Sequence, residues 1–302
     1  MMGLAASHLT LYGRAECAPH ALAHRVKAIK ALNDALSRPC ASRAEGDARF
    51  ATIMALTFQA SCMPEGMTEF LAMIRGCHVI ARTAMGGHGE GKDRGVQFEE
   101  SLFSSFVEEG GYYDNVWSLS EPSRLVLQRE NVGLLMEEAV ASLRALAPLC
   151  GSRLEVEFLV SLERVAKMVK ASAVQAFADL SDQYGMLSRA ANPDFAAFTD
   201  PDNHATQLIL IHFNLIEFHI GHLALGGAAR NRFAFRRRTC LAWTDRLCRT
   251  LPERYRRPYL DWPIKYCTGM AEWLPRLPDE LYPAARGLDG SVGAGRRQLT
   301  SS

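Results

Sequence analysis

The histidines of one apolar stretch are the first residues whose types and spacing could do chemistry. Residues 208–225 read LILIHFNLIEFHIGHLAL and carry His212, His219 and His222. On a helix His219 and His222 share a face, and His212 lies two turns before His219. Imidazoles bind zinc, but a site needs further ligands, which neighbouring helices would have to supply. Histidines satisfied within or between helices are the simpler interpretation, and we expect no bound metal and no cofactor.

A glycine-rich segment, GGHGEGK at residues 86–92, has the spacing of a phosphate-binding loop up to its lysine. Such a loop follows a strand, precedes a helix and ends in a Ser or Thr that holds magnesium. Here a helix is expected before the segment, and Asp93 replaces the hydroxyl residue. Because a carboxylate beside phosphates would repel them, we interpret residues 86–95 as an ordinary polar loop.

Arginines crowd residues 230–257, where Asp245 and Glu253 are the acidic residues. Basic residues interleaved with aromatic ones can follow a nucleic-acid backbone and stack on bases. A solvated basic face, with the aromatics turned into the core, is the alternative. The cluster at 236–238 would equally suit nuclear import or an acidic partner. The interleaved aromatics are Phe233, Phe235, Trp243 and Tyr255.

Methionines and aromatic residues on the apolar faces are candidates to line a cavity. Flexible methionines and rigid rings suit a flat apolar ligand, and plain core packing is the alternative. We expect helix 208–225 to be the hydrophobic centre and the wall of any cavity, beside the helices that carry Phe58, Phe70 and Trp243. The candidate ligand-pocket residues are Met54, Phe58, Phe70, Phe213, Phe218 and Trp243.

Apolar periodicity predicts that helices position these residues. Within residues 24–84 we expect three short amphipathic helices, separated by Arg38-Pro39 and by the turn Met63-Pro64-Glu65-Gly66. Strands are not indicated, so the predicted fold class is all-α, a single large multi-helix bundle. Further helices are predicted at 98–109, 120–146, 154–184, 204–225 (closed by Gly226-Gly227), 230–251 and 255–274, the last interrupted by Pro258 and Pro263.

Composition and charge bound the class of protein. The 302 residues are 48% hydrophobic and 22% charged, and a formal net charge of +1 gives no field toward nucleic acid or an anionic membrane. We expect a partly loose N-terminal segment 1–22, a helical domain 23–281 and a disordered tail 282–302. The polar residues of 208–225 argue against a membrane span. Without a signal-peptide pattern at the N-terminus, the expected location is the nucleus or the cytoplasm.

Parts of the chain resemble a known family. The stretches HRVKAIKALNDALS, DARFATIMALTFQAS and MTEFLAMIRGCHVI, and later CLAWTDRLCRTLPERYRRPYLDWP, are similar to the regulatory domain of fungal zinc-cluster transcription factors. The likeness is to the sterol-uptake-control group and covers about residues 23–281. It implies an all-α effector domain that in some members binds a sterol or similar lipid and controls activation of transcription.

The family's DNA-reading module is missing from this sequence. A fungal zinc cluster needs six closely spaced cysteines, whereas the eight cysteines here are scattered and no two are separated by only two residues. We expect free thiols in a reducing compartment. We also expect no sequence-specific DNA binding by this chain alone. The implied partners are a sterol-like molecule and the transcription machinery or a DNA-binding partner, and a homodimer is left open.

Two functions from different classes follow. The first is the effector domain of a transcription regulator, responsive to a sterol or another hydrophobic small molecule, in fungal gene regulation such as that of a metabolic or biosynthetic gene cluster. The alternative is a helical enzyme of a fungal biosynthetic pathway that acts on a hydrophobic substrate. Since no catalytic triad, paired-carboxylate motif or HExxH signature appears in the sequence, we expect a protein that is not an enzyme.

Overall fold

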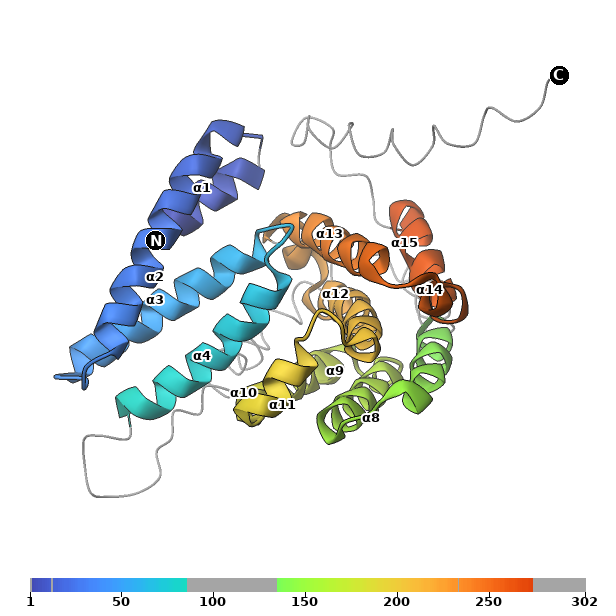
Figure 1. Ribbon diagram of the computed structural model, residues 1–302. Coiled ribbons are helices and arrows are strands. Elements are labelled where there is room, and N and C mark those ends of the chain that lie inside the picture. Colours follow the sequence, from blue (N-terminus) through green and yellow to red (C-terminus); the bar gives the residue numbers. More distant parts are fainter. Residues whose placement is uncertain (1, 12, 86–134, 233, 274–302) are drawn as a thin grey trace.

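The computed structural model describes residues 2–11, 13–85, 135–232 and 234–273, and in these ranges all regular structure is helical (Figure 1). The predicted all-α fold class is confirmed. Over the same ranges, no helix has the length and apolar character that a membrane crossing requires. The helices are α1 Met2–Leu11, α2 Ala18–Leu36, α3 Arg43–Ser61, α4 Met67–Met85, an unlabelled helix whose described part is 135–146, α8 Arg153–Met168, α9 Ala173–Asp179, α10 Ser181–Arg189, α11 Asn192–Phe198, α12 His204–Arg232, α13 Ala234–Thr250, α14 Glu253–Tyr259 and α15 Asp261–Trp273.

The three helices predicted between residues 24 and 84 are present as α2, α3 and α4. Ser42 caps α3, because its hydroxyl accepts the N–H of Glu45 at 3.2 Å. The turn between α3 and α4 needs its glycine, since a Cβ on Gly66 would lie 2.2 Å from the carbonyl oxygen of Ala60. This close approach lets α3 and α4 pack side by side as a helical hairpin (Figure 1).

The larger hydrophobic core is built around α12, whose residues from Thr206 to Ile216 are all buried. The helices α8, α9, α13 and α15 pack against α12, which lies between them in Figure 1. This confirms helix 208–225 as the hydrophobic centre of the fold. The Trp243 helix, α13, is a neighbour of α12 as expected.

The helices of Phe58 and Phe70 are placed differently relative to α12. α4, which carries Phe70, reaches α12 through Met67, whose sulfur accepts the side-chain amide of Asn214 at 3.4 Å. α3, which carries Phe58, packs against α1, α2 and α4. We expected α3 to lie beside the central helix α12. This is wrong, because α3 packs mainly against α1, α2 and α4.

A smaller core joins α2, α3 and α4. Its buried residues are Leu32, Ile53, Leu56, Cys77 and Ile80. The Cys77 thiol lies 3.5 Å from the hydroxyl of Thr57, and burial raises the pKa of this thiol, so it stays neutral. These contacts fix α3 and α4 in register on one side of the molecule.

The first residues of the chain form helices that pack on α3. The segment 1–22 is predicted to be partly loose, but α1 and the start of α2 occupy most of it. The buried amide of Gln59 holds this part to α3 by donating to the carbonyls of Gly3 and Ala21 and to the hydroxyl of Ser7, at 3.0–3.2 Å. A single buried amide that serves three acceptors is a contact that periodicity does not reveal.

α4 belongs to both cores and joins them. Its Leu71 lies in the larger core, while later turns of the same helix lie in the smaller one. Between them, the Arg75 guanidinium donates to the carbonyls of Leu187 and Ala190 and to the side chain of Asn192, and it lies over the ring of Phe195 at 4.8 Å. Arg75 therefore ties α4 to the junction of α10 and α11.

The predicted single helix over 154–184 is wrong. The structure has α8, α9 and the start of α10 there. α8 ends at Met168, and the Ser172 hydroxyl caps α9 by accepting the N–H of Gln175 at 3.1 Å. Apolar periodicity misses this break, because Val165 on one side and Ala176 on the other are both buried in the same core.

The predicted stop at Gly226-Gly227 is also wrong, since α12 continues to Arg232. Glycine within a helix costs only about 1 kcal/mol relative to alanine and does not end the helix by itself. α13 then begins at Ala234 instead of Arg230. The loop 86–95, the helix 98–109, the beginning of helix 120–146 and the tail 282–302 lie outside the described residues.

We expect Arg75→Met to lower the free energy of unfolding by roughly 2–3 kcal/mol, because two backbone carbonyls lose a charged donor. Arg144→Met is the matched control, since Arg144 is exposed and pairs with Glu163 on the surface, where a pair contributes under about 1 kcal/mol. Urea unfolding followed by circular dichroism measures both variants. Equal losses in the two would contradict a role for Arg75 in joining the cores.

Candidate functional site

A groove of about 980 Å³ lies between α2, α3 and α4, which are neighbours on one side of the molecule (Figure 1). Small-molecule sites commonly enclose about 300–1,000 Å³, so the groove has the capacity for such a ligand. Each helix contributes residues spaced three or four apart, which is one helical face. Six apolar side chains that line it are Leu32, Leu36, Ile53, Leu56, Met73 and Ile80.

The floor of the groove is apolar. Ile53, Leu56 and Ile80 are buried at its base, while Leu36 and Val79 are about half exposed at its rim. Gly76 lets Ile53 of α3 pack closely on α4, since a Cβ at position 76 would lie only 3.3 Å from the Cδ1 atom of Ile53. The floor offered to a ligand is therefore hydrocarbon, while the rest of the lining includes polar and charged side chains.

Arg25 fixes the end of the groove that lies near the start of α4. Its guanidinium is buried, donates to the carbonyl of Leu56 at 3.1 Å and pairs with Glu69. This contact connects α2 to both α3 and α4. Because α2 and α4 are held together here, the groove between them has a defined width at this end.

Three arginines line the groove, Arg38, Arg49 and Arg75, and none of its described lining residues is acidic. Arg49 is 8% exposed and donates through Nη2 to the carbonyls of Arg38 and Pro39, both at 3.3 Å. Its buried Nε–H has no hydrogen-bond partner. This orphaned donor is a feature that a folded protein normally satisfies.

Glu45 lies behind these arginines and is their counter-ion. It accepts the Ala41 amide and pairs with the guanidinium groups of Arg49 and Arg38, at 2.8 and 2.6 Å. Together these contacts lower the pKa of Glu45 to about 2. Two guanidinium groups thus share a single carboxylate at the turn between α2 and α3.

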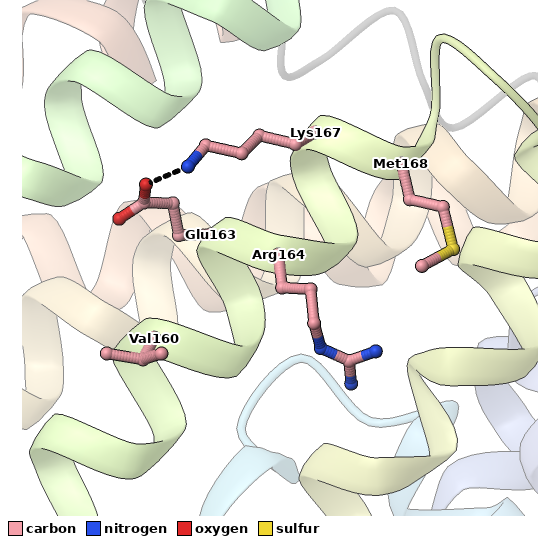
Figure 2. Close-up of a pocket in the computed structure, with 5 residues that line it drawn as sticks. All are labelled: Val160, Glu163, Arg164, Lys167 and Met168. Carbon is pink, nitrogen blue, oxygen red and sulfur yellow. Dashed lines mark ion pairs between the residues drawn. The ribbon is translucent and has the colours of Figure 1, made fainter.

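A second hollow, of about 450 Å³, lies on the outer face of α8. Figure 2 shows its lining residues, all from this one helix: Val160, Glu163, Arg164, Lys167 and Met168. Lys167 pairs with Glu163, and Arg164 points away from that pair, toward its own partners on α9 and α10. A hollow on one helix, with its charges already paired, cannot surround a ligand.

The structure divides the six predicted pocket residues between the two cores. Phe70 contacts the rings of both Tyr184 and Trp243, and Tyr184 in turn contacts Phe213 at 5.5 Å. Phe213 and Trp243 are buried, and the Trp243 indole donates to the Met63 carbonyl at 2.8 Å. These three predicted residues therefore form one packed aromatic row.

The other three predicted residues lie apart from this row. Phe218 packs at the edge of the larger core, and Met54 packs in the smaller core beside Cys77. Phe58 is 49% exposed on α3. None of the six lines the groove between α2, α3 and α4 or the hollow on α8.

The histidines of α12 make separate contacts. The Nδ1 atom of His219 lies 3.0 Å from the Tyr266 hydroxyl, whose pKa is raised by burial. The side chain of His222 lies outside the described residues. Across the described ranges, no cluster of three or more His, Cys, Asp or Glu residues is suited to hold a metal ion.

His212 and Ser142 form the one pair that resembles a nucleophile and its base among the contacts described here. The Ser142 hydroxyl lies 2.7 Å from Nε2, and Nδ1 lies 2.8 Å from the Leu208 carbonyl. Since a carbonyl only accepts, Nδ1 carries the proton and Ser142 donates to Nε2.

The surroundings of this pair argue against catalysis. Burial lowers the pKa of His212 to about 4, and the ring stacks on Trp262 at 5.3 Å. A base with this pKa is poorly matched to neutral pH, and neither the groove nor the hollow reaches the pair. We interpret it as a buried tie between helix 135–146 and α12.

The aromatic residues of the arginine-rich segment face inward where the structure describes them. Trp243 is buried, and the Tyr255 ring contacts His204 at 5.0 Å. Arg249 pairs with Asp245 on the surface, and Arg257 pairs with Glu253. This matches a solvated basic face with aromatics in the core; the side chains of Phe233, Phe235 and the first arginines lie outside the described residues.

The groove was not predicted from the sequence, because residue type alone favoured large aromatic side chains. The groove depends on a glycine, on alanine at the α4 rim and on an arginine inside α3. A signal was present: Arg49, Ile53 and Leu56 share one face of a predicted helix, as do Ala72, Gly76 and Ile80.

Comparison with known proteins gives no relative for this chain. No family model matches it, and neither the curated proteins nor the solved structures contain a significant match.

Acid should destabilise the protein through His212. The ordinary pKa of histidine is about 6.5 and the folded value is about 4, so the unfolded state binds more protons between these values. Stability is therefore complete above about pH 6.5 and falls as the pH drops toward 4, by roughly 3 kcal/mol in total.

Unfolding in urea at several pH values measures this effect. We expect His212→Gln to flatten the decline between pH 6.5 and 4, whereas the control His20→Gln, at an exposed position on α2, keeps the decline of the parent. The same slope in the parent and in His212→Gln would show that other groups cause the acid sensitivity.

Proposed function

We propose that this chain is a ligand-responsive regulatory domain, the effector domain of a transcription regulator, and that it binds a hydrophobic small molecule in the groove between α2, α3 and α4. The observation that carries the proposal is the groove itself, with its volume of about 980 Å³ and its apolar floor. The groove lies within residues 24–84, the part of the sequence that resembles fungal regulators with lipid-binding effector domains.

The position of the groove supports a regulatory role. Its walls are α2 and α3, which belong to the smaller core, and α4, which belongs to both cores. Arg75 lines the groove and also holds the carbonyls of Leu187 and Ala190. A ligand that moves α2 away from α4 would therefore shift Arg75 and its contacts at the junction of α10 and α11.

The contacts also support binding over turnover. A helical enzyme for hydrophobic substrates would need a reactive group at the groove. The described lining has arginines and the Cys40 thiol, which lies 3.1 Å from the Ser42 carbonyl, but neither a histidine nor a carboxylate. The proposal includes action in the nucleus or cytoplasm through the transcription machinery or a DNA-binding partner.

We expect the purified protein to bind ergosterol or a sixteen-carbon lipid, and Ala72→Phe to weaken that binding at least tenfold. Ala72 is exposed on α4 and lines the groove, so a phenylalanine there occupies ligand space without disturbing a core. Ala51→Phe is the matched control, an exposed alanine on α3 that does not line the groove. Native mass spectrometry with titrated lipid measures the three affinities.

Each outcome decides the matter. Weak binding by Ala72→Phe alone supports the groove as the site. Absence of binding by the parent, or equal binding by both variants, would contradict the proposal. Conversion of the bound lipid to a product would establish the enzyme alternative instead.

A further inference from the structure

We propose that the ligand of the groove between α2, α3 and α4 carries a carboxylate, and that this carboxylate binds Arg49 at the end of the groove formed by residues 37–40. The inference rests on the proposed function, because it assumes that the groove holds a hydrophobic molecule. It adds the chemical class of that molecule, an acid with a long or flat hydrocarbon body.

The unsatisfied donor of Arg49 is the first argument. The side chain lines the groove, is 8% exposed and has a buried Nε–H with no partner. A buried donor without an acceptor destabilises the fold by about 1–3 kcal/mol, and by more when it is charged. Because the Nε atom itself is buried, the guanidinium would have to turn toward the groove for a ligand to supply the missing acceptor. A carboxylate oxygen is a strong acceptor for a guanidinium N–H.

Charge balance is the second argument. At this turn Arg38 and Arg49 share one counter-ion, Glu45, which leaves one positive charge. Glu45 lies behind the groove and is not among its lining residues, and no described lining residue is acidic. A negatively charged head group at this turn offsets the excess of the Arg38–Arg49 pair; Arg75, which also lines the groove, contacts carbonyl and amide oxygens.

The layout of the groove gives the third argument. Arg49, Ile53 and Leu56 follow one another on a face of α3, so the backbone positions of residues 49 and 56 lie about 10 Å apart along the helix axis. At the far end α2 is held to α4 by the ion pair between the buried Arg25 and the half-exposed Glu69. A molecule with one charged end and an apolar body matches this order, with its head at Arg49 and its tail toward Arg25.

A carboxylate suits the site better than the other head groups considered. A neutral hydroxyl would leave the excess charge uncompensated. A phosphate dianion offers three acceptor oxygens, whereas Arg49 has one unsatisfied buried N–H and uses Nη2 for the carbonyls of Arg38 and Pro39. The monoanion matches the single excess charge of the Arg38–Arg49–Glu45 cluster and the single unsatisfied buried N–H of Arg49.

The test compares hexadecanoate with methyl hexadecanoate, which has the same chain and no charge. Isothermal titration of the full chain near pH 7.5 should show the acid binding about tenfold more tightly than the ester, with the difference decreasing in high salt. Arg49→Gln should lose this preference and still bind the ester, which shows that its groove is intact. Arg38→Gln, which removes an exposed arginine paired to the same Glu45, should keep most of the preference.

The outcomes separate this inference from the proposed function. Equal binding of acid and ester by the parent overturns the carboxylate and leaves the groove as a lipid site. Binding of neither, with ergosterol also unbound, overturns the proposed function. If Arg49→Gln does not fold, the ratio of the two affinities in the parent still decides. An equal loss of preference in Arg38→Gln and Arg49→Gln would assign the effect to the general field of the turn and would contradict a specific contact with Arg49.

Discussion

α4 contributes residues to both hydrophobic cores, and the rest of the structure depends on this shared helix. This helix packs on α3 in the smaller core, and its Leu71 lies in the larger core around α12. Arg75 makes both possible, since its guanidinium reaches backbone carbonyls more than a hundred residues away in the chain. α2 packs against α1 and α3, and the space above α3 between α2 and α4 is the groove. The concave site is thus a consequence of how two cores share one helix.

Charged side chains lie at the two ends of this groove, and apolar side chains line its middle. Buried guanidinium groups are expensive to desolvate, so each needs partners. Arg25 finds them in Glu69 and a backbone carbonyl, and it closes one end of the groove. Arg49 is only partly satisfied at the other end. The two ends of the groove therefore differ: the hydrogen bonds and ion pair of Arg25 are complete, whereas the Nε–H of Arg49 has no acceptor.

The sequence predicted the elements better than the site, for physical reasons. The helices of residues 24–84 were predictable because proline and glycine mark their ends, and α12 because its apolar run is long. The break at Ser172 was not, because buried residues continue on both sides of it. Long-range contacts such as Arg75 with Leu187 leave no local pattern.

The pocket residues show the same limit. Large aromatic side chains such as Phe213 and Trp243 found aromatic partners and filled the core. The groove is lined instead by smaller and aliphatic side chains and depends on the spacing between α2 and α4. That spacing depends on tertiary contacts, which composition and periodicity do not encode.

Hydrogen–deuterium exchange of the whole chain, with and without hexadecanoate, tests the central claim most directly. The account predicts slower exchange in residues 29–40, 49–56 and 72–80, the segments that line the groove, and no change in α8, whose outer hollow serves as the internal control. Protection centred on α8 or on the aromatic row around Phe213, with none in the three groove segments, would contradict it.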